Sequence, residues 1–306
     1  MKPPVHFARS PISCLCLFAS MAVLLLAGTV VGQTGMVKAA APTGKPFLVF
    51  DNMSYANKPD LSGADLISST VIYKRGEMKS AIAAGRLPDE VQFKATVKKR
   101  AAGRPGPIVI DIERLYLSKT HGATDEEIRF RFKLFITLAQ WTHEAAPGHL
   151  VGYYGHGLFP EEPGREYAAE TRDLIAAVDA FFPSMYVHGS QTRAQWTEKM
   201  QYLMQQAREI APGKPVYPYM WPQYHEGGPR ALEFVDGNYW KYLLETAHNF
   251  GADGVILWSG SQAWQDAPWW QVTLQFVAAK PVCLTNVHFN QPKPGKNGQP
   301  PAFEPD

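Results

Sequence analysis

Our interpretation of the fold starts from the segment 106-GPIVIDIERLYL-117. Its apolar residues 108–110 are β-branched and predict a buried strand. That strand runs directly into Asp111, Ile112 and Glu113. Carboxylates are poor strand formers, and burying them is costly unless they are paired or used. The acid pair therefore indicates either a functional site at a strand end or a helix-start or loop that follows the strand.

Six further apolar runs of similar character occur along the chain. They are 46-PFLVFDN-52, 66-LISSTVIYKR-75, 149-HLVGYY-154, 180-AFFPSMYV-187, 214-KPVYPYMW-221 and 253-DGVILWSG-260. Helical patterns lie between several of them, at 125–145, 193–213 and 238–254. Strands that alternate with helices predict the α/β class, with a parallel sheet covered by helices.

Both an open doubly wound sheet and a closed (β/α) barrel fit this alternation. No Gly-rich phosphate loop follows the first run, which continues as FDNMSYANKPD. Polar and aromatic residues instead cluster at the carboxyl ends of the runs, where barrel active sites lie. The sequence thus favours a distorted (β/α) TIM-like barrel of about seven strands.

The two ends of the chain differ in composition from its body. An apolar block follows basic residues near the start and precedes small residues at 39–41, which predicts a signal peptide over 1–41. An uncleaved membrane anchor is the alternative. A Pro- and Gly-rich tail, 290–306, is expected to be disordered. This leaves one barrel domain over 42–289, in a secreted or periplasmic protein without stable membrane insertion after cleavage.

Composition argues against several classes of partner. The 30 Lys and Arg residues nearly balance the 28 Asp and Glu residues, so no nucleic acid partner is indicated. Cys283 is the one cysteine outside the predicted signal, so no internal disulfide framework is expected. His143, His149 and His156 do not have the spacing of a known metal motif. We expect no metal and no cofactor.

The spacing of the acids suggests a chemistry. If the strand stays extended, Asp111 and Glu113 share one face and Ile112 points to the helices. Their carboxylates would then lie roughly 6 to 7 Å apart along the strand. Burial and mutual repulsion raise the pKa of one member of such a pair. A proton-holding acid beside an ionised one suits glycoside hydrolysis.

Aromatic residues at the other strand ends suit a sugar substrate, because sugar C–H faces pack on aromatic rings. The alternative for each is barrel core. The expected substrate-binding residues are Tyr153, Tyr154, Tyr186, Tyr219, Trp221 and Trp258, with Asp51 as a partner for a sugar hydroxyl. His225 and Glu226 follow the sixth run, and we expect them in a solvated loop.

These residues carry a resemblance. VIDIE resembles the strand-end acid pair of the hyaluronidase family of glycoside hydrolases, the bee-venom and mammalian type. VGYYG, FFPSMYV, KPVYPYMWPQY and GADGVILWSG resemble that family's later strand motifs in the same order, so the resemblance spans 106–260. It implies an irregular seven-stranded barrel and a substrate-assisted retaining mechanism, in which the substrate's acetamido oxygen attacks its own anomeric carbon.

The resemblance also implies roles for individual residues. Glu113 would protonate the leaving oxygen, and Asp111 would hold the acetamido N–H. Tyr186 and Tyr154 would hydrogen-bond the acetamido group, and Trp258 would form the floor of the site. The chain departs from the family at several points. It has Ile112 where the family has an aromatic residue, and Tyr116 where the family usually has Arg, although Arg114 is nearby. It also lacks the family's disulfides and cysteine-rich module.

The sequence therefore predicts a secreted retaining glycoside hydrolase acting on a polysaccharide or oligosaccharide with 2-acetamido sugars. Two alternatives stay open. One is a glycosidase of a non-acetamido glycan that uses a separate carboxylate, for which Glu226, Asp253 or Asp51 could serve. The other is a non-catalytic carbohydrate-binding barrel.

Overall fold

The structure is a computed structural model, and it describes residues 46–155 and 166–279. These residues belong to one compact unit. The predicted signal peptide, the predicted tail and His156 lie outside the described residues.

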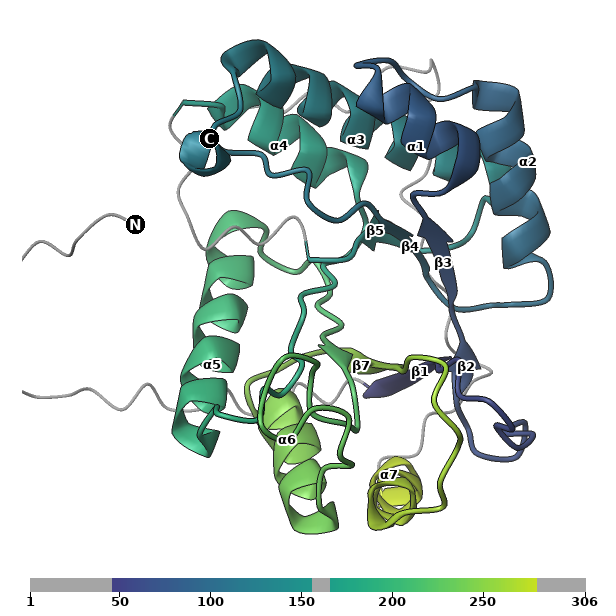
Figure 1. Cartoon of the computed structure of the whole chain (residues 1–306), viewed down its shortest axis with the longest axis vertical. Coiled ribbons are helices and arrows are strands. Elements are labelled where there is room, and N and C mark those ends of the chain that lie inside the picture. Colours follow the sequence, from purple (N-terminus) through teal and green to yellow (C-terminus); the bar gives the residue numbers. More distant parts are fainter. Residues whose placement is uncertain (1–45, 156–165, 280–306) are drawn as a thin grey trace, which may run out of the picture. The chain divides into compact units, whose positions relative to one another are not determined.

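The strands form two parallel sheets (Figure 1). One has the order β2-β1-β7-β6 and the other the order β3-β4-β5. The strand bounds are β1 Leu48–Asn52, β2 Ile67–Ser68, β3 Thr70–Tyr73, β4 Ile108–Asp111, β5 Val151–Tyr153, β6 Tyr219–Met220 and β7 Gly254–Trp258. All pairings between these strands are parallel, which confirms the predicted α/β class.

The predicted run 66–75 supplies two strands, because it changes partner halfway. Its first half, β2, pairs with β1, and its second half, β3, pairs with β4. The change occurs at Ser69, whose amide donates to the carbonyl of Asp51 over 3.0 Å. The next amide, that of Thr70, donates to the carbonyl of Pro107 over 2.9 Å. One continuous segment therefore connects the two sheets.

The predicted strand 180–187 forms only isolated parallel bridges, between Phe182 and Tyr154, Phe181 and Val216, and Ser184 and Tyr219. Pro183 interrupts the ladder because it has no amide hydrogen to donate. On its other side, Gly152 lets this segment approach β5: a Cβ there would lie 2.4 Å from the carbonyl oxygen of Ala180. The segment thus links β5 to β6.

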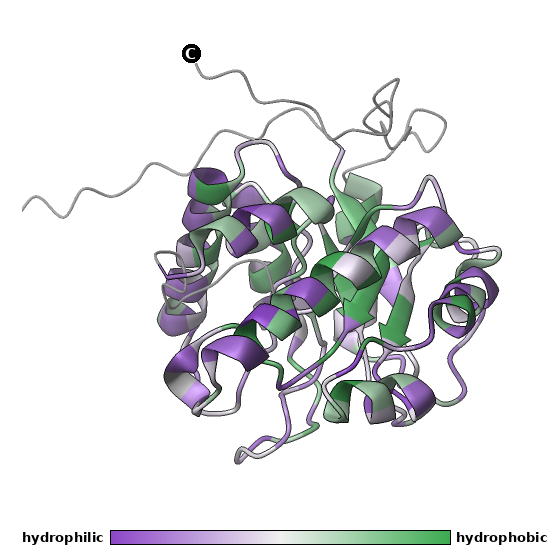
Figure 2. Ribbon diagram, turned by 90° about the horizontal axis from the view of Figure 1, so that it is seen from above, coloured by the Kyte–Doolittle hydropathy of each residue, from purple (hydrophilic) through white to green (hydrophobic). Residues whose placement is uncertain are grey.

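Helices follow most of the strands. Their bounds are α1 Gly76–Ala83, α2 Glu90–Ala101, η1 Lys119–His121, α3 Asp125–Ala145, α4 Ala168–Ala177, α5 Arg193–Ile210, α6 Gly237–Asn249 and α7 Pro268–Ala279. Capping boxes start the two longest: Thr124 with Glu127 at α3, and Thr192 with Gln195 at α5. Figure 2 shows strands that are mostly hydrophobic, and helices with mixed faces. No helix in the described residues is long and apolar enough to cross a membrane.

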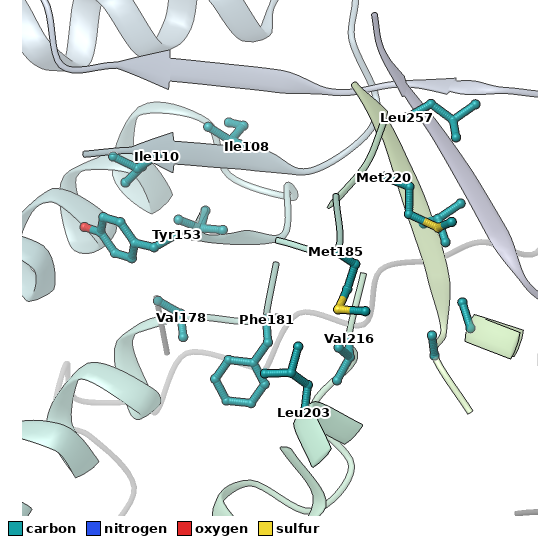
Figure 3. Close-up of a cluster of buried hydrophobic side chains, with 14 of the residues drawn as sticks. Ile108, Ile110, Tyr153, Val178, Phe181, Met185, Leu203, Val216, Met220 and Leu257 are labelled. Atoms are coloured by element: carbon teal, nitrogen blue, oxygen red, sulfur yellow. The ribbon is translucent and has the colours of Figure 1, made fainter. Parts of the chain in front are cut away.

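The buried side chains form two clusters, and successive residues along a strand belong to one cluster and the other in turn. Ile108 and Ile110 of β4 belong to the cluster packed against the helices, part of which Figure 3 shows. Val109 belongs to the second, inner cluster with Phe50 and Ile256. Ile112 continues the outer set and is fully buried. This parity turns Asp111, between two outward residues, toward the inner side.

Candidate active site

A cleft of about 440 Å³ lies at the carboxyl ends of the strands and opens to solvent. Six of its lining residues are ones that the sequence singled out: Asp111, Glu113, Tyr154, Tyr186, Tyr219 and Trp258. Val71, Tyr73 and His225 complete the lining. The structure thus gathers residues that are up to about 190 positions apart in the chain around one hollow.

Asp111 occupies the buried side of this cleft. It ends β4 and pairs in register with Tyr73 of β3. Its Oδ1 atom is buried and has no hydrogen-bond partner among the described residues. Burial, with the charge of Glu113 second, raises the pKa of Asp111 from 3.8 to about 6, while Lys74 and Arg75 act in the opposite direction. Because Asp111 lines the cleft, its carboxylate can accept a hydrogen bond from a ligand bound there.

Glu113 lies in a turn, because β4 ends two residues before it. This corrects the expectation that the chain stays extended through both acids. The next residue, Arg114, has a left-handed φ of 63° and turns the chain away from the sheet. The carbonyl of Glu113 accepts a hydrogen bond of 2.8 Å from Lys74 Nζ. The side chain of Glu113 is exposed and also lines the cleft, which suits a group that exchanges protons with substrate and water.

Three tyrosines form a wall of the cleft. The hydroxyl of Tyr154 donates to Ser184 Oγ over 3.1 Å, and Asn52 Nδ2 donates to the hydroxyl of Tyr219 over 3.3 Å. The ring of Tyr154 lies edge-on to Tyr219 at 5.0 Å and tilted to Tyr186 at 6.0 Å. Burial raises the pKa of all three hydroxyls. They consequently stay protonated and can donate hydrogen bonds near neutral pH.

Trp258 supplies the apolar surface of the cleft, and Trp221 supports it. The two indole rings are perpendicular, with centroids 4.8 Å apart. Trp221 is 3% exposed, does not line the cleft, and donates its Nε1 hydrogen to Gln223 Oε1 over 3.1 Å. Tyr186 packs against both rings, at 5.4 Å from Trp258 and 5.9 Å from Trp221. The structure therefore places Trp221 behind Trp258 and outside the cleft.

Besides Trp221, two further residues expected in the site lie outside the cleft. Tyr153 is 2% exposed and belongs to the outer cluster (Figure 3). Its ring stacks on Phe135, and its hydroxyl donates to the carbonyl of that residue. The carboxylate of Asp51 forms an ion pair of 2.8 Å with Lys58 and accepts a hydrogen bond of 2.9 Å from the amide of Met53. Neither side chain lines the cleft.

The different positions of Tyr153 and Tyr154 lead to opposite expected results. Tyr153→Phe should cost about 1 kcal/mol of unfolding free energy, through one lost buried hydrogen bond, and leave KM unchanged. Tyr154→Phe should change kinetic constants by several fold, because it removes a donor from the cleft. Urea unfolding and steady-state kinetics on both variants check this. A raised KM in Tyr153→Phe together with wild-type kinetics in Tyr154→Phe would contradict the assignment.

Sequence reasoning missed three lining residues, Val71, Tyr73 and His225. Tyr73 ends β3 beside Asp111, so the strand-end rule applied to run 66–75 could have found it. His225 was expected in a solvated loop, but it is half-buried and its ring stacks on Tyr186 at 5.8 Å. Glu226 is exposed and does not line the cleft.

The other carboxylates considered as catalytic partners are also outside the cleft. Asp253 precedes the first residue of β7, at the end of the strand opposite the cleft, and accepts a hydrogen bond of 3.0 Å from the amide of Val216. Asp51 is held by Lys58. Within 46–155 and 166–279, the carboxylates that line the cleft are therefore Asp111 and Glu113.

The histidines around β5 have structural partners. A ring nitrogen of His149 lies 2.8 Å from the carbonyl oxygen of Gly106, and one of His143 lies 3.2 Å from that of Ala177. In the described part of the chain, no group of three or more His, Cys, Asp or Glu side chains could hold a metal ion.

Known structures share this architecture. No protein-family model matches the chain, and no curated protein matches it by sequence. Among solved structures, bee venom hyaluronidase aligns with a TM-score of 0.55 and 16% identity, over 76% of this chain and 96% of that one. The same enzyme in complex with a hyaluronic acid tetramer aligns with a TM-score of 0.55 and 16% identity, over 78% and 96%. A GH18 chitinase from Pseudoalteromonas aurantia aligns with a TM-score of 0.45 and 11% identity, over 71% and 77%. The alignments with bee venom hyaluronidase show that the chain shares the overall α/β fold of that protein, with parallel strands.

Proposed function

We propose that this protein is a retaining glycoside hydrolase that cleaves polysaccharides or oligosaccharides containing 2-acetamido sugars by a substrate-assisted mechanism. One observation carries the proposal. Asp111, a half-buried carboxylate with one unpartnered oxygen, lies beside an exposed acid, Glu113, in an aromatic cleft where the described residues supply no other carboxylate. Two acids on one strand end suit one side of a sugar, because a carboxylate pair that flanks a glycosidic bond stands across the cleft.

In the first step, the acetamido oxygen of the substrate attacks its own anomeric carbon and forms a cyclic oxazolinium. The glycosidic C–O bond breaks, and the leaving oxygen takes the proton of Glu113. Asp111 accepts a hydrogen bond from the acetamido N–H and stabilises the positive charge that develops there. In the second step, water attacks the anomeric carbon and gives a proton to the Glu113 carboxylate. The ring of the oxazolinium reopens, and the configuration is retained.

The remaining lining residues have supporting roles in this proposal. Tyr186 hydrogen-bonds the acetamido group as a neutral donor, Tyr154 does so when its hydroxyl turns from Ser184 to the substrate, and Tyr219 extends their wall. Trp258 packs against the sugar ring, with Trp221 fixing its orientation. The bound hyaluronic acid tetramer in the bee venom enzyme supports a carbohydrate substrate for this fold.

We extend the proposal to the barrel and to export. The chain of neighbours β1, run 66–75, β4, β5, segment 180–187, β6 and β7 returns to β1, which supports a distorted seven-stranded barrel. The basic, apolar and small residues of 1–41 support secretion.

Substrate class and mechanism can be tested together. Purified protein is assayed on hyaluronan, chondroitin, chitin oligomers and glycans without acetamido groups, and turnover is expected only on the acetamido glycans. Binding of these glycans without turnover of any would point instead to a non-catalytic binding barrel. Cleavage of only the glycans without acetamido groups would favour a separate carboxylate as nucleophile or base.

The mechanism also predicts which covalent species can form. A thiazoline analogue of the acetamido sugar should inhibit the enzyme at concentrations well below KM, because it mimics the cyclised intermediate. Incubation with a 2-fluoro glycoside should leave the mass of the intact protein unchanged, because no enzyme carboxylate acts as nucleophile. A stable glycosyl adduct on an Asp or Glu would rule out the substrate-assisted mechanism.

A further inference from the structure

Lys74 contacts the backbone of both acids from the neighbouring strand. It follows the last residue of β3, and its amide donates to the carbonyl of Asp111 over 3.1 Å. Its side-chain Nζ donates to the carbonyl of Glu113 over 2.8 Å. One residue thus connects β3 to the end of β4 and to the turn that follows. The roles proposed above do not use Lys74.

We propose that Lys74 is a positioning residue that holds the turn carrying Glu113 and places a positive charge beside the acid pair; this rests on the proposed function. The hydrogen bond from Lys74 is needed because Glu113 lies beyond the end of β4 and makes no strand hydrogen bonds. The adjoining Arg114 adopts a left-handed conformation that is unfavourable for a residue with a side chain. In the described residues, the bond from Lys74 is the only hydrogen bond that the structure gives Glu113.

The ammonium group also acts on the charges of the site. Burial lowers the pKa of Lys74, and the neighbouring acids Asp111 and Glu113 raise it. In return, Lys74 is the first of two cations that lower the pKa of Asp111, Arg75 being the second. The guanidinium of Arg75 lies 4.7 Å from the ring centroid of Tyr73. The charged and titratable groups that face Asp111 are Tyr73, Lys74, Arg75, Glu113, Tyr154, Tyr186 and Tyr219.

Two substitutions distinguish the hydrogen bond and charge of Lys74 from the packing of its side chain. Lys74→Met keeps the length of the side chain but removes both the donor and the charge. We expect kcat to fall on the order of tenfold to a hundredfold, with KM nearly unchanged, because the acid is misplaced but the binding wall is intact. Lys74→Arg keeps a donor and a charge and should restore most of kcat. The matched control is Lys79→Met, on the exposed face of α1, which should behave as wild type.

The pH dependence gives a readout that a structural role would not move. Loss of the ammonium raises the pKa of Asp111 further above 6, so the acid limb of kcat/KM should shift to higher pH in Lys74→Met. The limb should keep its wild-type position in Lys74→Arg and Lys79→Met. The same shift can be measured without turnover, by ¹³C NMR titration of carboxyl groups, with the Asp111 signal assigned by its absence in Asp111→Asn.

The outcomes separate this proposal from the proposed function. Wild-type protein that cleaves none of the glycans refutes the function, and the NMR titration then still decides whether Lys74 controls the charge of Asp111. Wild-type kcat and an unmoved acid limb in Lys74→Met would overturn the role of Lys74 while leaving the function intact. The role would also be overturned if Lys74→Met and Lys74→Arg lost kcat to the same extent and were both lowered in melting temperature by the same amount. Lys74 would then be needed only for folding.

Discussion

Glu113→Gln is expected to remove nearly all turnover and to leave the fold unchanged. The carboxyl proton that protonates the leaving oxygen disappears, and general acid catalysis is worth about 10²- to 10⁴-fold. The side chain is exposed and the hydrogen bond from Lys74 goes to the backbone carbonyl, so an amide of the same shape disturbs no described contact. The measurement is kcat/KM on the best glycan of the screen, with the melting temperature recorded alongside.

Two comparisons make this result specific. An aryl glycoside with a good leaving group needs little protonation, so the first step of Glu113→Gln should be much less impaired on that substrate than on the natural glycan. Glu226→Gln, at an exposed acid outside the cleft, should retain wild-type rates. If Glu113→Gln stayed within a few fold of wild type while Glu226→Gln lost activity, the acid would be misassigned.

The strands could be predicted because their residues are distinctive. Runs such as 108–110 are apolar and β-branched, and polar or aromatic residues follow them directly. The helix starts of α3 and α5 could be recognised from Thr124 with Glu127 and Thr192 with Gln195. These signals are local, so they can be recognised without knowing which strands pair.

Register could not be read from the sequence, and it explains the misplacement of Tyr153. Alternation says that Tyr153 and Tyr154 face opposite sides, but not which of them faces the cleft. Pairing of Ile110 with Tyr153 settles this, because paired residues share a face and Ile110 faces the helices. Tyr154 then lies on the same side as Asp111, in the cleft.

The turn after β4 could not be predicted either. Nothing in ERLY specifies a left-handed residue, since Arg114 is neither Gly nor Asn. The position of Glu113 therefore depends on Lys74, a contact between residues 39 positions apart. The unpartnered oxygen of Asp111 is likewise a property of its surroundings in three dimensions.

Asp111→Asn is expected to lose activity and to gain stability above about pH 6. An amide cannot stabilise the developing positive charge of the acetamido group, so kcat should fall on the order of a hundredfold or more. The gain in stability has a separate origin. The wild-type protein buries a carboxylate that has an unpartnered oxygen and lies near Glu113, and the substitution removes that charge. Sites arranged for function often lower stability in this way.

The sign of the pH dependence distinguishes this explanation from better packing. The pKa of Asp111 is raised from 3.8 to about 6 on folding, so its favourable contribution is complete below pH 3.8 and is lost as the pH rises through 6. At 1.36 kcal/mol per pKa unit, reduced for partial exposure to solvent, the wild type should lose about 1 to 2 kcal/mol relative to Asp111→Asn between pH 4 and pH 8. Urea unfolding of both proteins at several pH values measures this difference, and comparing the two cancels any constant effect of the amide itself. A difference in unfolding free energy that does not change with pH would show that Asp111 is not a buried, poorly compensated charge.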